Sequence, residues 1–339
     1  MGWRLLLAPL AVFIASWWLT GRVLGWLTRR AILDRPVARS SHRAAVPRGG
    51  GLALLPPIIA AWLVLAALGQ APPGSAGIAV LAAALAALSW RDDVRGLPAW
   101  LRLSAHLVAA ALGLALLPGA GAVFQGMLPP LLDRVATALL WVRFVNLFNF
   151  MDGIDGITGV ETAASGIGVA LVVLSIGNDP DGSAVLALTL AAGVLAFLCW
   201  NWHPAQLFLG DVGSVPLGYL LGWLLLTLAT KGLWAPALIL PLYYLADATI
   251  TLVRRLLRRE RVWEAHRQHF YQRALGDDGN HAAVAMMVLA ADMLLVLLAL
   301  LALAEPRWAL AGAGVVVAAL LALMARRARP RPSARRATR

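Results

Sequence analysis

Long apolar runs separated by short polar segments occupy almost the whole of this 339-residue chain. An α-helix needs about 20 consecutive apolar residues to cross the hydrocarbon core of a bilayer. Eleven runs approach or reach that length, and each predicts a membrane-spanning helix: residues 3–26, 51–68, 75–90, 103–118, 131–148, 157–176, 183–200, 214–230, 233–253, 281–304 and 306–325. The third and fourth runs are short, so ten spans are the alternative count.

The composition agrees with this pattern, since 60% of the residues are hydrophobic and only 14% are charged. Soluble proteins carry nearer a quarter charged residues. We therefore expect an all-α, polytopic integral membrane protein, with residues 1–325 as one transmembrane catalytic domain and residues 326–339 as a basic, disordered cytoplasmic tail. The first run resembles a signal peptide, but it lacks a small-residue cleavage site before Trp17 and continues to Trp26, which predicts an uncleaved span.

The net charge of +12 does not indicate nucleic-acid binding, because the basic residues are confined to short loops and the tail. Arginines are dense in two places, between the first two runs (Arg29, Arg30, Arg35, Arg39, Arg43, Arg48) and in the tail (Arg326, Arg327, Arg329, Arg331, Arg335, Arg336, Arg339). Eleven spans put both on one side, and positive charge favours the cytoplasm. The N-terminus is then outside and the C-terminus inside. The single cysteine, Cys199, excludes an internal disulfide and fits cytoplasmic loops.

This topology places every chemically suggestive loop on the cytoplasmic side: residues 35–51, 91–102, 146–156, 201–214 and 254–281. The loops predicted to face outward, such as residues 69–77, are short and bland. Five polar loops on one membrane face predict a single active site assembled from distant parts of the chain.

The loop at residues 146–156 carries two carboxamides, Asn146 and Asn149, and two carboxylates, Asp152 and Asp155. Polar groups between two spans are costly unless they face water or line a wet cavity. On a helical turn Asp152 and Asp155 would share one face, because they are three residues apart. The alternative is an ordinary solvated loop.

Three further loops carry acidic or phosphate-binding chemistry. The glycine run 49–51 after Arg48 suits phosphate at a helix N-terminus, although positive-inside topology also explains the arginine. The adjacent Asp92 and Asp93 repel each other and so indicate a nearby cation, a metal ion or an arginine, unless both are solvated. Asp211, between two glycines before a span, suits Mg²⁺, with helix capping as the alternative.

Residues 254–273 predict a basic amphipathic helix on the membrane surface. His266, His269 and Arg273 would share one face of it and grip a diphosphate; a zinc pair is disfavoured by the spacing. His106 is expected to bond to a helix neighbour. Asp247 is an intramembrane carboxylate, for which Arg254 or Arg255 is the nearest cation in sequence.

Together these residues resemble the polyprenyl-phosphate N-acetylhexosamine-1-phosphate transferase family, also called glycosyltransferase family 4. The resemblance runs from about Arg35 to His281. It rests on four ordered motifs: Asp92-Asp93, Asn146–Gly156, Pro204–Gly218 and His266–Arg273.

The resemblance implies that undecaprenyl phosphate attacks the β-phosphorus of a UDP-N-acetylhexosamine at the cytoplasmic face of the bacterial inner membrane and releases UMP. It implies Asp211 as the Mg²⁺ ligand, with Mn²⁺ as a substitute, and Asp92 and Asp93 as the catalytic pair. The remaining implied substrate-binding residues are Asn149, Asp152 and Asp155 for the nucleotide, and Arg267, His269 and Arg273 for the diphosphate or sugar. Membrane lipids and a second copy of the chain are the other implied partners; nucleic acid is not.

Two departures favour the branch of the family that starts O-antigen or related surface polysaccharides. Arg95 stands where the peptidoglycan branch has a lysine, and the histidines are spaced rather than adjacent. A muramoyl-pentapeptide substrate is the alternative within the family. Outside it, the main rival is a polytopic transporter or lipid flippase, which would carry charged or broken helices near the membrane midplane.

Overall fold

The structure is a computed structural model that describes residues 2–34, 45–118, 122–177, 181–261, 266–276 and 279–328. Residues 35–44 of the loop predicted at residues 35–51, and the tail beyond residue 328, lie outside the described residues. The described elements are helices apart from one two-stranded antiparallel sheet, β1 (Leu33–Asp34) with β2 (Val46–Pro47). The all-α prediction is therefore confirmed.

The helices follow the predicted apolar runs closely. They are α1 (Gly2–Arg29), α2 (Gly51–Ala67), α3 (Ser75–Arg95), α4 (Ala99–Leu114), α5 (Pro130–Met151), α6 (Ile157–Ser175), α7 (Ser183–Asn201), α8 (Asp211–Thr230), α9 (Trp234–Ile239), α10 (Leu242–Leu257), α11 (Phe270–Ala274), α12 (His281–Leu301) and α13 (Pro306–Arg327). The helices at the polar loops extend past their apolar cores, so Asp92 and Asp93 lie in the last turn of α3 and Asp211 begins α8.

Seven of these helices are long and apolar enough to cross a membrane: α1, α3, α6, α7, α8, α12 and α13. The helices α2 and α4 are apolar but shorter. The helix α5 is long enough but carries Asp133, Arg134 and Arg143. The fold is that of a polytopic membrane protein, while eleven spans and the orientation stay predictions.

The ninth apolar run is not one helix, as expected, but two. Helix α9 ends at Ile239 and α10 begins at Leu242. Pro241 lies at the break, where its missing N–H and its ring prevent a continuous helix. At the break, the carbonyl of Leu240 accepts the Ser165 hydroxyl at 3.4 Å.

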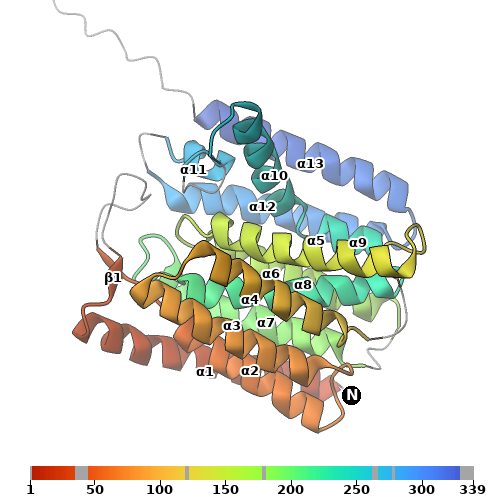
Figure 1. The fold of residues 1–339 in the computed structure, drawn as a ribbon, viewed down its shortest axis with the longest axis horizontal. Coiled ribbons are helices and arrows are strands. Elements are labelled where there is room, and N and C mark those ends of the chain that lie inside the picture. Colours follow the sequence, from red (N-terminus) through yellow and green to blue (C-terminus); the bar gives the residue numbers. More distant parts are fainter. Residues whose placement is uncertain are drawn as a thin grey trace, which may run out of the picture.

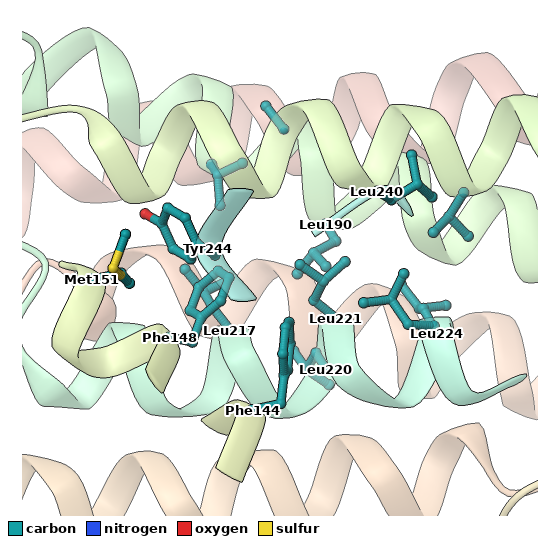
Figure 2. Packing of buried hydrophobic residues seen from close by; sticks show 14 of the residues in the cluster. Phe144, Phe148, Met151, Leu190, Leu217, Leu220, Leu221, Leu224, Leu240 and Tyr244 are labelled. Atoms are coloured by element: carbon teal, nitrogen blue, oxygen red, sulfur yellow. The ribbon is translucent and has the colours of Figure 1, made fainter. Parts of the chain in front are cut away.

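Helix α8 forms the centre of the bundle, and its whole apolar stretch is buried. It packs against α2, α3, α5, α6 and α9. Figure 2 shows the α8 leucines beside Phe144 and Phe148 of α5, with Tyr244 of α10 next to Phe148. Gly218 and Gly222 let α5 approach, because a Cβ at either position would stand within 3 Å of Phe148 or Trp141. This packing fixes the N-terminus of α8, and with it Asp211.

The short elements between the long helices gather at one end of the bundle. Figure 1 shows β1 and α11 at the left end and the N-terminus at the right end. The loops predicted to be cytoplasmic therefore share one end, opposite the N-terminus. This arrangement fits the predicted sidedness, and the contacts below show how closely the loops approach one another.

Candidate active site

A short backbone pairing brings the segment before α2 to the segment before α8. Arg48 forms a parallel bridge with Phe208, and Phe208 N–H donates to Pro47 O at 2.8 Å. The N–H groups of Gly49 and Gly50 both donate to Phe208 O, at 3.1 and 2.9 Å. Since Gly51 N–H also bonds to Leu209 O, the glycine run does not offer its amides to phosphate, and that prediction is wrong. The glycines serve close packing: a Cβ at Gly51 would stand 2.4 Å from Gly213 Cα.

This pairing places Arg48 between two carboxylates from different helices. Its Nη2 lies 2.8 Å from Asp93 Oδ1 and 2.6 Å from Asp211 Oδ1. Burial lowers the pKa of Arg48, but the two carboxylates raise it by more, so the pKa lies above its usual value. The guanidinium therefore carries a permanent charge that neutralises both acids.

A second arginine joins the cluster from α4. Arg102 Nη1 lies 2.9 Å from Asp92 Oδ2 and 3.8 Å from Asp211 Oδ2, while Asp92 Oδ1 accepts Leu97 N–H at 2.6 Å. Arg102 was not among the site residues predicted from the sequence. A basic residue in the first turn of a helix opposes the helix dipole, and this unfavourable placement was the available signal for an acidic partner.

The resulting carboxylate cluster, defined as Asp92, Asp93 and Asp211 with Arg48 and Arg102, has oxygen donors suited to a hard divalent ion. Asp211 is the most accessible of the acids, with 18% of its side chain exposed against 10% for Asp92 and 3% for Asp93. Arg48 Nη2 shows that a cationic group fits between Asp93 and Asp211. The donor set therefore fits Mg²⁺ with Asp211 as the ligand that reaches solvent.

The asparagines of the central loop mainly hold the helices around this cluster. Asn149 Oδ1 accepts the Ser214 hydroxyl at 2.5 Å, which ties α5 to the first turn of α8. Asn146 donates to Val142 O at 2.8 Å within α5, and its side chain lies beside His106 of α4, which is the helix neighbour that was expected.

Asp152 and Asp155 do not share a helical face, because α5 ends at Met151 and residues 152–156 form an irregular loop. The carboxyl of Asp152 lies within electrostatic range of Arg48, Asp211 and Asp93 of the carboxylate cluster. Burial raises the pKa of Asp152 to about 7 despite a hydrogen bond from Thr158. This carboxyl is therefore poised to change its charge near neutral pH.

Asp155 instead joins a separate cluster with two histidines from distant segments. His203 Nδ1 lies 2.6 Å from Asp155 Oδ2, and His281 Nδ1 lies 3.1 Å from Asp155 Oδ1. Burial raises the pKa of Asp155, but the contacts with His281 and His203 lower it by more, so the pKa lies below its usual value.

These three residues have ligand types that suit a transition metal, and their ligand atoms lie within 4.8 Å of one another. Each atom is nevertheless engaged already, since Asp155 Oδ2 also accepts Ala205 N–H and Asp155 N–H donates to His281 Nδ1. The cluster therefore works as a clamp that joins the loop after α5, the turn after α7 and the start of α12. Sequence reasoning missed His203 and His281, which show no local motif.

The segment before α12 differs from the predicted amphipathic helix. Helix α10 ends at Leu257, residues 266–268 are not helical, and α11 covers only Phe270–Ala274. The expected shared face of His266, His269 and Arg273 is therefore wrong. The two imidazoles still stack, with centroids 4.8 Å apart, while the side chains of Arg267 and Arg273 are exposed.

The histidines of this segment face the bundle. His269 is buried, and its Nδ1 lies 3.1 Å from Asp247 Oδ1, so Asp247 contacts His269 where Arg254 or Arg255 was expected as its partner. Burial, with the neighbouring His269, lowers the pKa of His266 to about 4. A neutral imidazole at physiological pH does not supply the positive charge that a diphosphate grip requires.

Comparison with known proteins gives matches over most of the chain. A model of the family "Glycosyl transferase family 4" matches residues 75–229. A decaprenyl-phosphate N-acetylglucosaminephosphotransferase of Mycobacterium leprae is 28% identical over 329 residues, covering 84% of this chain and 80% of that protein. A probable undecaprenyl-phosphate N-acetylglucosaminyl 1-phosphate transferase of Bacillus subtilis is 26% identical, covering 76% and 73%. A phospho-N-acetylmuramoyl-pentapeptide-transferase of Thermosynechococcus vestitus is 32% identical, covering 60% and 55%.

Proposed function

The chain belongs to glycosyltransferase family 4, and from that membership and the geometry of the carboxylate cluster we propose that it transfers an N-acetylhexosamine 1-phosphate from a UDP-sugar to undecaprenyl phosphate. An oxygen of the lipid phosphate forms a bond to the β-phosphorus. The bond from that phosphorus to the bridging oxygen breaks, and UMP leaves. The product is a sugar-diphosphate-lipid that starts a surface polysaccharide.

One observation carries the proposal: acids from α3 and α8, 118 residues apart, share the arginines Arg48 and Arg102 at one end of the bundle. Both reactants bring phosphates, so fixed cations at a water–membrane boundary lower the cost of bringing them together. Arg48 and Arg102 are held in place by Asp93 and Asp92, and each has an exposed side-chain portion that a phosphate oxygen can reach.

The family implies Mg²⁺, and Asp211 with Asp92 would hold it. When bound, the ion supplies charge neutralisation at the diphosphate. Residues of the chain position the helices and bind the reactants. Asp93 is the least exposed acid and fixes the helix start, so we assign it to positioning, while Asp92 and Asp211 reach the open side of the cluster. Asn149 and Asp152 border the nucleotide.

The loop clustering supports an active site on the cytoplasmic face of the bacterial inner membrane, where UDP-sugars are found. The names of the Mycobacterium leprae and Bacillus subtilis relatives support N-acetylglucosamine as the first sugar to test. The name of the Thermosynechococcus vestitus relative keeps the muramoyl-pentapeptide nucleotide as the second candidate.

The test is UMP release by the purified protein in vesicles that contain undecaprenyl phosphate and Mg²⁺, supplied in turn with UDP-N-acetylglucosamine, UDP-N-acetylgalactosamine and UDP-N-acetylmuramoyl-pentapeptide. We expect release with one N-acetylhexosamine nucleotide and a lipid-linked sugar of matching mass. Release with the pentapeptide nucleotide alone selects the other branch. No release with any of them overturns the proposal.

The transporter alternative has one observation in its favour. Glu161 of α6 and Asp292 of α12 are buried inside the bundle, with their carboxyls facing each other. Buried acids in membrane helices often mark ion pathways. Flux of lipid or solute across vesicles without UMP release would select this alternative.

A further inference from the structure

Tyr271 of α11 reaches across the bundle to the loop that carries Asp152. Its side chain is fully buried, and its hydroxyl donates to Phe150 O at 3.1 Å, 121 residues away in sequence. The phenol also lies on Gly153, where a Cβ would stand 2.2 Å from the Tyr271 oxygen. A glycine is therefore required beneath this ring.

Tyr271 has its own support from Asp247, which is fully buried in α10. Asp247 Oδ1 accepts Phe270 N–H at 3.0 Å, and Oδ2 accepts Tyr271 N–H at 3.2 Å. These are amides at the start of α11, which have no partner within the helix. Asp247 also contacts His269, whose ring stacks on Tyr271 with centroids 5.6 Å apart. The position of the phenol is therefore fixed from α10.

Phe150 lies in the last turn of α5, directly before the 152–156 loop, and Tyr271 touches that loop itself at Gly153. Gly153 and Gly156 lack side chains, and Gly156 has a φ of 77°. Ordering a backbone segment costs conformational entropy, which a ligand must supply if the loop is not already ordered. The clamp of Asp155 with His203 and His281 holds the far side of the loop. On the side next to Asp152, Tyr271 packs on Gly153 and bonds to the end of α5.

We propose that the Tyr271 hydroxyl is a positioning group that pre-orders the 152–156 loop for the nucleotide sugar. The inference rests on the proposed function, because Asp152 borders the nucleotide only in that account. Tyr271 does not touch the reacting phosphates. Its loss weakens binding of the soluble reactant and leaves the lipid phosphate and the chemical step unchanged.

The test is Tyr271→Phe, which removes only the hydroxyl, beside Tyr219→Phe as the matched control. Tyr219 is also buried, and its hydroxyl donates to a backbone carbonyl, Ala109 O, at 2.8 Å, within the helix bundle. In Tyr271→Phe we expect the KM for the UDP-sugar to rise about tenfold, equivalent to about 1.4 kcal/mol. The kcat and the KM for undecaprenyl phosphate stay within about twofold of the wild type. Tyr219→Phe retains wild-type constants.

A second measurement reads the loop directly and needs no substrate. Hydrogen–deuterium exchange of the full-length protein in nanodiscs should be faster at residues 152–156 in Tyr271→Phe than in the wild type, and unchanged there in Tyr219→Phe. Unchanged exchange and unchanged KM in Tyr271→Phe overturn the inference, as does an equal effect in both variants. If the wild type releases no UMP but exchange at residues 152–156 is still faster in Tyr271→Phe, the proposed function is wrong while Tyr271 still orders the loop.

Discussion

The carboxylate of Asp93 caps the helix that begins at Asp211. Asp93 Oδ1 accepts Asp211 N–H at 3.2 Å, and Oδ2 accepts Val212 N–H at 2.9 Å. A negative charge is favourable at a helix N-terminus, where amides are unpaired and the helix dipole is positive. Gly210 permits this approach, since a Cβ there would stand 2.9 Å from Asp93 Oδ2. Asp211 is thereby relieved of the capping role and directs its own carboxylate to the arginines.

Asp93→Asn should destabilise the protein through this cap. The partners of the Asp93 side chain are two backbone N–H groups of α8 and the Arg48 guanidinium, which are all donors. The NH₂ of an asparagine is also a donor, so it cannot bond to them. Loss of a cap costs about 1–2 kcal/mol. The midpoint of thermal unfolding in detergent should fall measurably. Glu305→Gln is the control, because Glu305 stands at the start of α13 without a side-chain capping bond and should leave the midpoint unchanged. An equal midpoint for both variants would contradict the capping role.

Arg102→Gln should reduce UMP release by about tenfold or more, because a charge-assisted contact to Asp92 and a cation facing Asp211 are both lost. Arg95→Gln is the matched control. Arg95 is an exposed arginine in the last turn of α3 and should tolerate the change with nearly full activity. Equal activity in the two variants would remove Arg102 from the site.

Much of this arrangement could be predicted from the sequence, and the reason is physical. Apolar runs fix where membrane helices form, and polar residues at their ends mark the loops. The sequence therefore indicated Asp92, Asp93, Asp152 and Asp211. The number of spans and the positions of the arginines also predict that the polar loops lie at one end of the bundle.

The site features that were missed or wrongly predicted depend on contacts between segments that are distant in sequence. Nothing near Asp155 in sequence points to His203 or His281, and nothing near Arg102 names Asp92 as its partner except an unfavourable helix position. The amphipathic reading of residues 254–273 failed because Asp247 draws His269 and the α11 amides into the bundle. A helical periodicity cannot reveal that a carboxylate of another helix binds these amides and starts a short, separate helix at Phe270.

The pKa of Asp152 predicts a pH-dependent stability. A carboxyl whose pKa is raised to about 7 in the folded protein binds its proton more tightly than in the unfolded chain. Its contribution to stability is fully present below the unfolded pKa of about 4 and is lost as the pH rises through about 7. Without divalent ions, the unfolding midpoint of the wild type should fall between pH 5 and pH 8. In Asp152→Asn that fall should be smaller, and an identical pH dependence would contradict the assignment.

The predicted orientation can be tested by labelling cysteines from one side. In a Cys199→Ala background, Arg95→Cys and Met127→Cys each place one exposed thiol at opposite ends of the bundle. An impermeant maleimide added to intact spheroplasts should label the thiol at position 127, and should label the thiol at position 95 only after the membrane is opened. The reverse pattern would put the carboxylate cluster outside.

The most direct test of the central claim is the Mg²⁺ dependence of UMP release in Asp211→Asn. Asp181→Asn is the matched control, because Asp181 pairs with Lys231 away from the carboxylate cluster. The account predicts saturable Mg²⁺ activation in the wild type and in Asp181→Asn, and a loss of about 100-fold or more in Asp211→Asn, since electrostatic groups at a reacting centre contribute on this scale. Wild-type rates and an unchanged Mg²⁺ curve in Asp211→Asn would contradict it.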